Sequence, residues 1–139
     1  MSFAHVLVLY DGSAEAAVAL SAAEALASRD RALLTVAAVV ELEGGAIGCS
    51  IGASTWNQVL RDAAHADLRR AAALLDMPAR FEVLCGRREE AALVDGADLF
   101  GCDAIMLPSR PRRLLSRAMT RNRAPAIRRR AHCAVLQPD

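Results

Sequence analysis

The chain has 139 residues, of which 54% are hydrophobic and 24% are charged, and its formal net charge is +1. This length suits one domain over residues 1–139, large enough to bury a single core. Because no stretch reaches the about 18 uninterrupted apolar residues of a membrane span, and no signal-type leader follows Met1, we expect a soluble, cytoplasmic protein with no membrane contact.

The charges are unevenly distributed along the chain. Residues 1–103 hold fifteen acids and eight arginines, a balance of −7, whereas residues 104–139 hold nine arginines and one acid, a balance of +8. The C-terminal quarter is therefore a basic block, although the whole chain is close to neutral.

The first part of the chain alternates between apolar runs and other segments. Residues 3–10 form a short apolar run that ends in Asp-Gly-Ser, which predicts a buried strand, and Ser13 can cap a helix over residues 14–29. A second apolar run, 32–41, predicts the next strand. The glycine-rich segment 41–55 predicts a loop.

The rest of the chain continues this alternation. Apolar residues recur every three or four positions over residues 56–76, which predicts an amphipathic helix that Pro78 ends. The remaining segments are predicted in the order strand, helix, strand, helix, strand, over residues 80–85, 87–100, 102–107, 123–130 and 132–137.

Apolar strands that alternate with helices are typical of a parallel sheet whose two faces are both covered. The predicted fold is therefore α/β, a doubly wound five-stranded parallel sheet with helices on both faces, which is a Rossmann-like arrangement. In such sheets ligands bind outside the carboxyl ends of the strands, where the strand order reverses. We therefore expect any site in the loops that follow the first, second and fourth strands.

The cysteines and histidines form no recognisable catalytic or metal-binding pattern. The four cysteines include no Cys-x-x-Cys pair, so we predict neither a disulfide framework nor a metal site. Three of them are expected to act as small hydrophobic residues, and Cys49 falls in the glycine-rich loop. We expect His5 and His132 in the core and His65 at the surface.

Other residues that could carry chemistry have simpler interpretations. Asp95, Asp98 and Asp103 cluster around one predicted turn and are expected on a solvated face. No serine, cysteine or threonine lies in a nucleophile-elbow pattern. The sequence therefore predicts no catalytic residue, and we expect the protein not to be an enzyme.

Several segments, in their order and spacing, resemble the universal stress protein family. The stretch "YDGSAEAAVAL" is similar to that family's first strand and the turn into its first helix, and "VLCG" is similar to its third strand. The stretches "CDAIMLPS" and "RRAHCAVL" resemble the ends of its fourth and fifth strands. The resemblance covers the whole chain, with the loop after the second strand matching least, and implies a non-catalytic protein of stress response or regulation.

The resemblance also points to a degenerate phosphate loop. Nucleotide-binding members of the family carry the pattern G-x2-G-x9-G-[S/T] after the fourth strand, and the matching positions here are Pro108, Pro111, Arg121 and Asn122. Glycine lets backbone N–H groups approach an anion, whereas proline fixes φ and has no N–H. We therefore expect that ATP binding is lost and that the protein has no cofactor. Asn122 can still cap the last helix.

A ligand-binding alternative stays open. By resemblance, Asp11 matches the position that faces adenosine in nucleotide-binding relatives, and Val39 matches an adenine-side residue. A divergent sensor of ATP, AMP or another anion would then use Asp11 together with the arginines of residues 110–121, such as Arg110, whose guanidinium groups would replace the lost N–H donors. Equally, Asp11 suits an ordinary turn before glycine and Val39 suits an ordinary core.

Protein partners are the remaining expectation. The resemblance implies a homodimer formed through the last strand, with Cys133, Val135 and Leu136 in the interface, and a second copy would cover the unpaired edge of that strand. The basic block is either a solvated surface, with arginines 128–130 at the negative end of the last helix, or a site for an acidic protein partner. Nucleic acid is disfavoured because no aromatic residues lie among the arginines.

Overall fold

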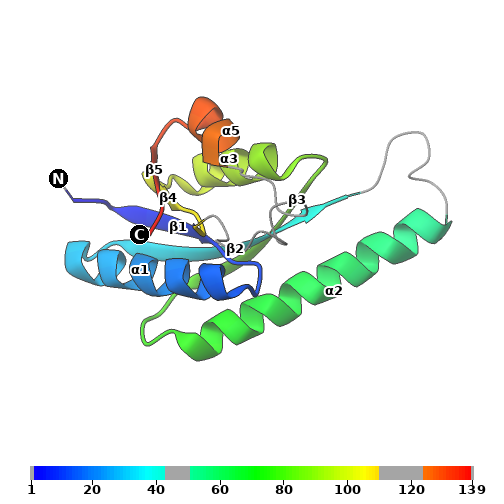
Figure 1. The fold of residues 1–139 in the computed structure, drawn as a ribbon, viewed down its shortest axis with the longest axis horizontal. Helices are drawn as coiled ribbons and strands as arrows, with labels where there is room; N and C mark the ends of the chain where they lie inside the picture. Colours follow the sequence, from blue (N-terminus) through cyan, green and yellow to red (C-terminus); the bar gives the residue numbers. More distant parts are fainter. Residues whose placement is uncertain (1, 43–50, 110–123, 139) are drawn as a thin grey trace.

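The computed structural model describes residues 2–42, 51–109 and 124–138. In these residues five parallel strands form one sheet in the order β3-β2-β1-β4-β5. The strands are β1 (His5–Leu9), β2 (Leu33–Glu41), β3 (Arg80–Gly86), β4 (Ala104–Met106) and β5 (Ala134–Leu136). The described helices are α1 (Ala14–Asp30), α2 (Ile51–Leu74), α3 (Glu89–Phe100) and α5 (Ala124–Arg130). The predicted doubly wound α/β fold is confirmed (Figure 1).

The helices cover both faces of the sheet, with α1 and α2 on one face and α3 and α5 on the other (Figure 1). Successive residues of β1 serve the two faces in turn. Val6 and Val8 pack with the α1 and α2 side, whereas Leu7 and Leu9 pack with the α3 and α5 side. Because β1 is buried on both faces, its residues after His5 are all apolar and show no alternation.

The strand order reverses beside β1, which pairs with β2 on one side and with β4 on the other. The chain first builds outward to β3 and then crosses back to β4 and β5, so β3 and β5 form the two edges of the sheet. The carboxyl end of β1 therefore lies where ligands bind in doubly wound sheets.

The predicted start of the first helix is confirmed at atomic detail. Ser13 has extended backbone geometry, and its hydroxyl accepts a hydrogen bond of 3.1 Å from the backbone N–H of Ala16. At the other end Arg31 adopts a left-handed conformation with φ of 55°, and its N–H bonds back to carbonyls of the last turn. Local capping chemistry thus fixes both ends of α1.

Asp103 joins the amino ends of β4 and β1. Its carboxylate oxygens accept hydrogen bonds of 2.9 Å each from the backbone N–H groups of Ala4 and His5. Burial alone would raise the pKa of Asp103, but these backbone donors outweigh burial and hold the pKa below its ordinary value. Asp95 and Asp98 are exposed, as predicted, whereas Asp103 is half-buried and satisfies backbone donors at the start of the central strand.

The three histidines were predicted with mixed success. His5 is buried, and its Nε2 lies 2.7 Å from the Thr35 hydroxyl, as expected of a satisfied core histidine, while His65 is exposed as predicted. His132 was placed in the core wrongly, because β5 begins only at Ala134. Its side chain is 77% exposed, with Nδ1 lying 3.1 Å from a carboxylate oxygen of Asp98.

Two other predictions needed correction. Helix α2 begins at Ile51, five residues before the predicted start at residue 56, and its first turns extend past the sheet in Figure 1, where no apolar stripe is needed. Cys85 is exposed, not buried as a small hydrophobic residue, because it lies on the edge strand β3.

Candidate functional site

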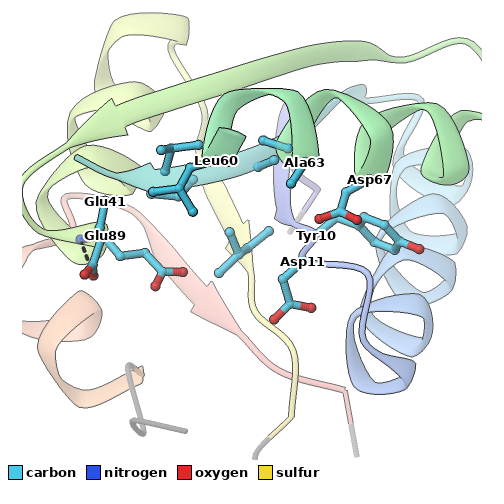
Figure 2. Close-up of a pocket in the computed structure, with 12 residues that line it drawn as sticks. Tyr10, Asp11, Glu41, Leu60, Ala63, Asp67 and Glu89 are labelled. Carbon is cyan, nitrogen blue, oxygen red and sulfur yellow. Dashed lines mark hydrogen bonds between the residues drawn. The ribbon is translucent and has the colours of Figure 1, made fainter. Parts of the chain in front are cut away.

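A cleft with a volume of about 320 Å³ lies against α2 at the carboxyl ends of β1 and β2 (Figure 2). Twelve residues line it: Leu9, Tyr10, Asp11, Ala38, Val39, Val40, Glu41, Leu60, Ala63, Ala64, Asp67 and Glu89. Most of them are apolar, with a few acidic groups among them, which is the usual make-up of a small-molecule pocket. The cleft adjoins the reversal of strand order beside β1.

One end of the cleft is formed by the turn that follows β1. The Asp11 carboxylate accepts a hydrogen bond of 3.0 Å from the backbone N–H of Ser13, and Gly12 has a positive φ of 82°. A carboxylate oxygen of Asp67 lies 2.9 Å from the point where a Cβ on Gly12 would stand. Glycine therefore serves two purposes here: it allows the backbone conformation, and it leaves room for the Asp67 carboxylate.

The opposite end of the cleft is formed by β2 and the start of α3. A carboxylate oxygen of Glu41 accepts a hydrogen bond of 3.2 Å from the backbone N–H of Glu89 (Figure 2). Arg88, at the N-cap of α3, makes no side-chain cap bond, so Glu41 supplies an acceptor for the first turn instead. Figure 2 shows Leu60 and Ala63 of α2 between the two acidic ends.

Among the residues that the structure describes, the charge of the cleft lining is one-sided. Its lining includes four carboxylates, those of Asp11, Glu41, Asp67 and Glu89, and no arginine, lysine or histidine among the described residues. The Arg70 guanidinium forms an ion pair with Asp67 from outside the lining, and its side chain is 64% exposed. The described part of the lining therefore presents hydrogen-bond acceptors and negative charge to a ligand.

The predicted ligand-facing residues are only partly brought together. Asp11 and Val39, from the ends of β1 and β2, both line the cleft, whereas Pro108 does not. Positions Arg110, Pro111, Arg121 and Asn122 lie outside the described residues.

Residues 108 and 109, which follow β4, are instead hydrogen-bonded to the C-terminal residues 137 and 138. The backbone carbonyl of Pro108 accepts a hydrogen bond of 3.1 Å from the side-chain amide of Gln137. Ser109 donates its hydroxyl to the carbonyl of Pro138 at 2.6 Å. These contacts direct the polar groups of residues 108 and 109 toward the tail.

The residues predicted for a dimer contact lie on the edge strand β5 or just before it. Cys133, Val135 and Leu136 are all half-buried. Cys133 and Val135 pack against the core on the α3 and α5 side, and Leu136 packs against the opposite core. The edge position is therefore as expected, while these side chains are largely engaged within the chain itself.

Three acidic residues of the cleft were missed from the sequence: Glu41, Asp67 and Glu89. Asp67 carried a recognisable signal, because it falls seven residues after Leu60 and therefore on the same face of α2. Glu41 and Glu89 carried none. They come together only because β2 and the loop after β3 end at the same edge of the sheet.

The thiols of Cys102 and Cys133, on the α3 and α5 side, are in environments that favour the protonated form. Burial, together with nearby Cys133 and Asp103, raises the pKa of the Cys102 thiol to about 11. Burial likewise raises the pKa of Cys133. Since the thiolate is the reactive form, neither geometry nor acidity favours a nucleophilic role.

The remaining surface features are simple. The arginines at positions 128–130 are exposed in the last turn of α5, where they favourably meet its negative end. Within the described ranges, no group of three or more His, Cys, Asp or Glu residues is arranged to hold a metal ion. No described helix is long and apolar enough to cross a membrane.

Comparison with known proteins places this geometry in context. A structure of a universal stress protein family member from Burkholderia pseudomallei is 23% identical, with a TM-score of 0.74, and the match covers 97% of this chain and 95% of that one. Universal stress protein UspA from Lactobacillus plantarum is 19% identical, with a TM-score of 0.80 and coverage of 100% and 99%.

A third solved structure, a universal stress protein in complex with cAMP, is 22% identical, with a TM-score of 0.62 and coverage of 100% and 98%. At these identities the structures support the fold and not a shared ligand. The comparison with curated proteins found no match. The model of the universal stress protein family, however, matches residues 2–137, nearly the whole chain. This chain therefore belongs to the universal stress protein family.

Proposed function

We propose that this protein acts in the cytoplasmic stress response by associating with protein partners and not by catalysis. We also propose that it has lost ATP binding. Family membership supports the stress-response role. The observation that carries the loss of ATP binding is Pro108 at the first glycine position of the phosphate loop, because proline has no backbone N–H to offer a phosphate. The described lining of the cleft, with four carboxylates and no cation, supports the same conclusion. A triphosphate entering this space would meet like charges at close range.

The exit of β4 supports the same proposal. A phosphate loop needs free backbone N–H groups aimed at the anion, and Pro108 has none. Its neighbour Ser109 uses its hydroxyl on the C-terminal tail. Pro111 and Arg121, in place of two further glycines, remove another donor and add bulk by sequence alone.

The test is calorimetric titration of the purified protein with ATP, after denaturing a sample to look for released nucleotide. We expect no binding tighter than about 10 μM, roughly 7 kcal/mol. A matched variant restores the family pattern with Pro108→Gly, Pro111→Gly, Arg121→Gly and Asn122→Ser. If lost glycines are the cause, this variant binds ATP more tightly than the parent. Tight binding by the parent protein would refute the proposal.

A second candidate is a divergent sensor of an adenine nucleotide or another anion. Two observations favour it: Asp11 and Val39 line one cleft, and a structural neighbour was solved in complex with cAMP. Titration with ATP, AMP and cAMP separates the two candidates. If the sensor is correct, Asp11→Asn, which keeps an acceptor for the Ser13 N–H, weakens binding of the nucleotide.

The association we propose is a homodimer through β5. Support comes from the edge position of this strand, whose outer backbone groups a second copy would pair. Hydrogen exchange at low and high micromolar concentration tests it. We expect amides of β5 to gain protection at the higher concentration, while amides of β3, the opposite edge, serve as the internal control. A monomer in sedimentation at micromolar concentration would exclude this dimer.

A further inference from the structure

The cleft combines apolar walls with acidic ends. Asp11 and Asp67 lie at one end, and Glu41 and Glu89 lie at the other, with Leu60 and Ala63 between them (Figure 2). Carboxylates accept hydrogen bonds and attract positive charge, whereas the apolar walls favour a hydrocarbon stem. The shape and the charge thus select the same kind of molecule.

The helix that walls the cleft continues this surface. Trp56, Leu60, Ala63 and Asp67 follow one another at spacings of four, three and four residues, so they share one face of α2. Three of these four residues line the cleft, and Trp56 lies one turn beyond Leu60. Trp56 is 49% exposed, so its indole is accessible to a ligand. An exposed indole one helical turn from an acidic cleft is a combination that can recognise organic cations.

We propose that this cleft binds a small organic cation, specifically a protonated aliphatic amine. An ammonium group carries N–H donors and no acceptor, so it can donate to Asp11 or Asp67 at one end and to Glu41 at the other. The aliphatic stem would contact Leu60, Ala63 and Val39, and a cationic end would reach the indole of Trp56. The inference rests on the proposed function, because a cleft whose negative charge attracts a cation does not favour the binding of a triphosphate.

Arg70 is the internal competitor for this ligand. Its guanidinium pairs with Asp67. Since the Arg70 side chain is largely exposed, this ion pair is weak. An entering ammonium group can therefore share the Asp67 carboxylate with Arg70 or displace the guanidinium from it. Removing the guanidinium therefore makes Asp67 more available and tightens amine binding.

The experiment uses the intrinsic fluorescence of Trp56, which is the sole tryptophan of the chain, together with calorimetry. The probe is putrescine, with 1,4-butanediol and succinate as matched neutral and anionic molecules of the same chain length. We expect putrescine to change the Trp56 emission in a saturable and salt-sensitive way, and the other two probes to leave it unchanged.

Three variants localise the effect. Asp67→Asn should weaken putrescine binding about tenfold, because a neutral amide replaces a charged acceptor. Arg70→Gln should strengthen it about twofold to fivefold. Asp62→Asn is the matched control on the same helix, because Asp62 does not line the cleft and instead accepts from Gln58. This control should stay within twofold of the parent, about 0.4 kcal/mol.

Each outcome decides the matter. If the protein binds neither putrescine nor ATP, this inference is overturned and the proposed function is unaffected. Tight ATP binding refutes the proposed function, and this inference falls with it. Equal weakening by Asp67→Asn and Asp62→Asn also overturns the inference, since the amine would then respond to overall charge and not to the cleft.

Discussion

Replacing Asp103 with asparagine tests how the central strand is held. One carboxylate accepts from the N–H groups of Ala4 and His5, at 2.9 Å each. An amide has one acceptor oxygen and turns an NH2 group toward the other donor, so one of the two bonds is lost. Hydrogen bonds to charged groups contribute about 1.5–3 kcal/mol each, and the Ala4 bond is exposed, so we expect a loss of about 1.5–3 kcal/mol in total.

The loss should depend on pH in a defined direction. Because the pKa of Asp103 is lowered in the folded state, its contribution is fully present above the ordinary carboxyl pKa near 4 and is lost as pH falls through the folded value. The difference in the free energy of unfolding between parent and Asp103→Asn should therefore be constant from neutral pH to about pH 5 and shrink below about pH 4.

Urea unfolding followed by circular dichroism measures this difference. In thermal melts it corresponds to a midpoint lowered by roughly 5–15 °C for a chain of this size. Asp95→Asn on the exposed side of α3 is the control, with an expected change within about 0.5 kcal/mol. The reasoning fails if Asp103→Asn matches this control, or if the loss persists unchanged at low pH.

Three further outcomes follow from buried or strained positions. Thr35→Val should cost about 1–3 kcal/mol in urea unfolding, because the ring nitrogen of His5 loses its partner, and pairing it with His5→Leu should cost less than the sum of the two changes. Gly12→Ala should cost about 1–3 kcal/mol, since its φ is positive and its Cβ position is occupied; stability equal to the parent would contradict this. In alkylation at about pH 8, mass spectrometry should find Cys85 modified and Cys102 spared until unfolding; equal labelling rates would contradict the buried thiol.

The fold was predictable because its signals are local. The continuous apolar run of β1 and the cap at Ser13 each depend on a few adjacent residues, and both were confirmed. Errors arose where the context is tertiary. The start of α2 was placed too late, because its first turns lie beyond the sheet and need no apolar stripe. His132 was placed in the core because β5 was predicted to begin two residues earlier than it does.

The candidate site was harder to predict than the fold. Asp11 and Val39 were named from resemblance, and they do meet in one cleft. The acidic character of that cleft was not foreseen, because Asp67 lies on a different element from Asp11 and 56 positions further along the chain. The positions that replace the family's phosphate loop beyond Pro108 lie outside the described residues, so their role stays a prediction.

The contact between Gly12 and Asp67 links two positions that would otherwise vary independently. A Cβ at position 12 would stand 2.9 Å from a carboxylate oxygen of Asp67, so loss of the glycine requires the Asp67 side chain to rotate away or to be replaced. The two positions should therefore covary among related sequences. A glycine–acid pair at these places can identify which relatives share this kind of cleft, even where overall identity is low.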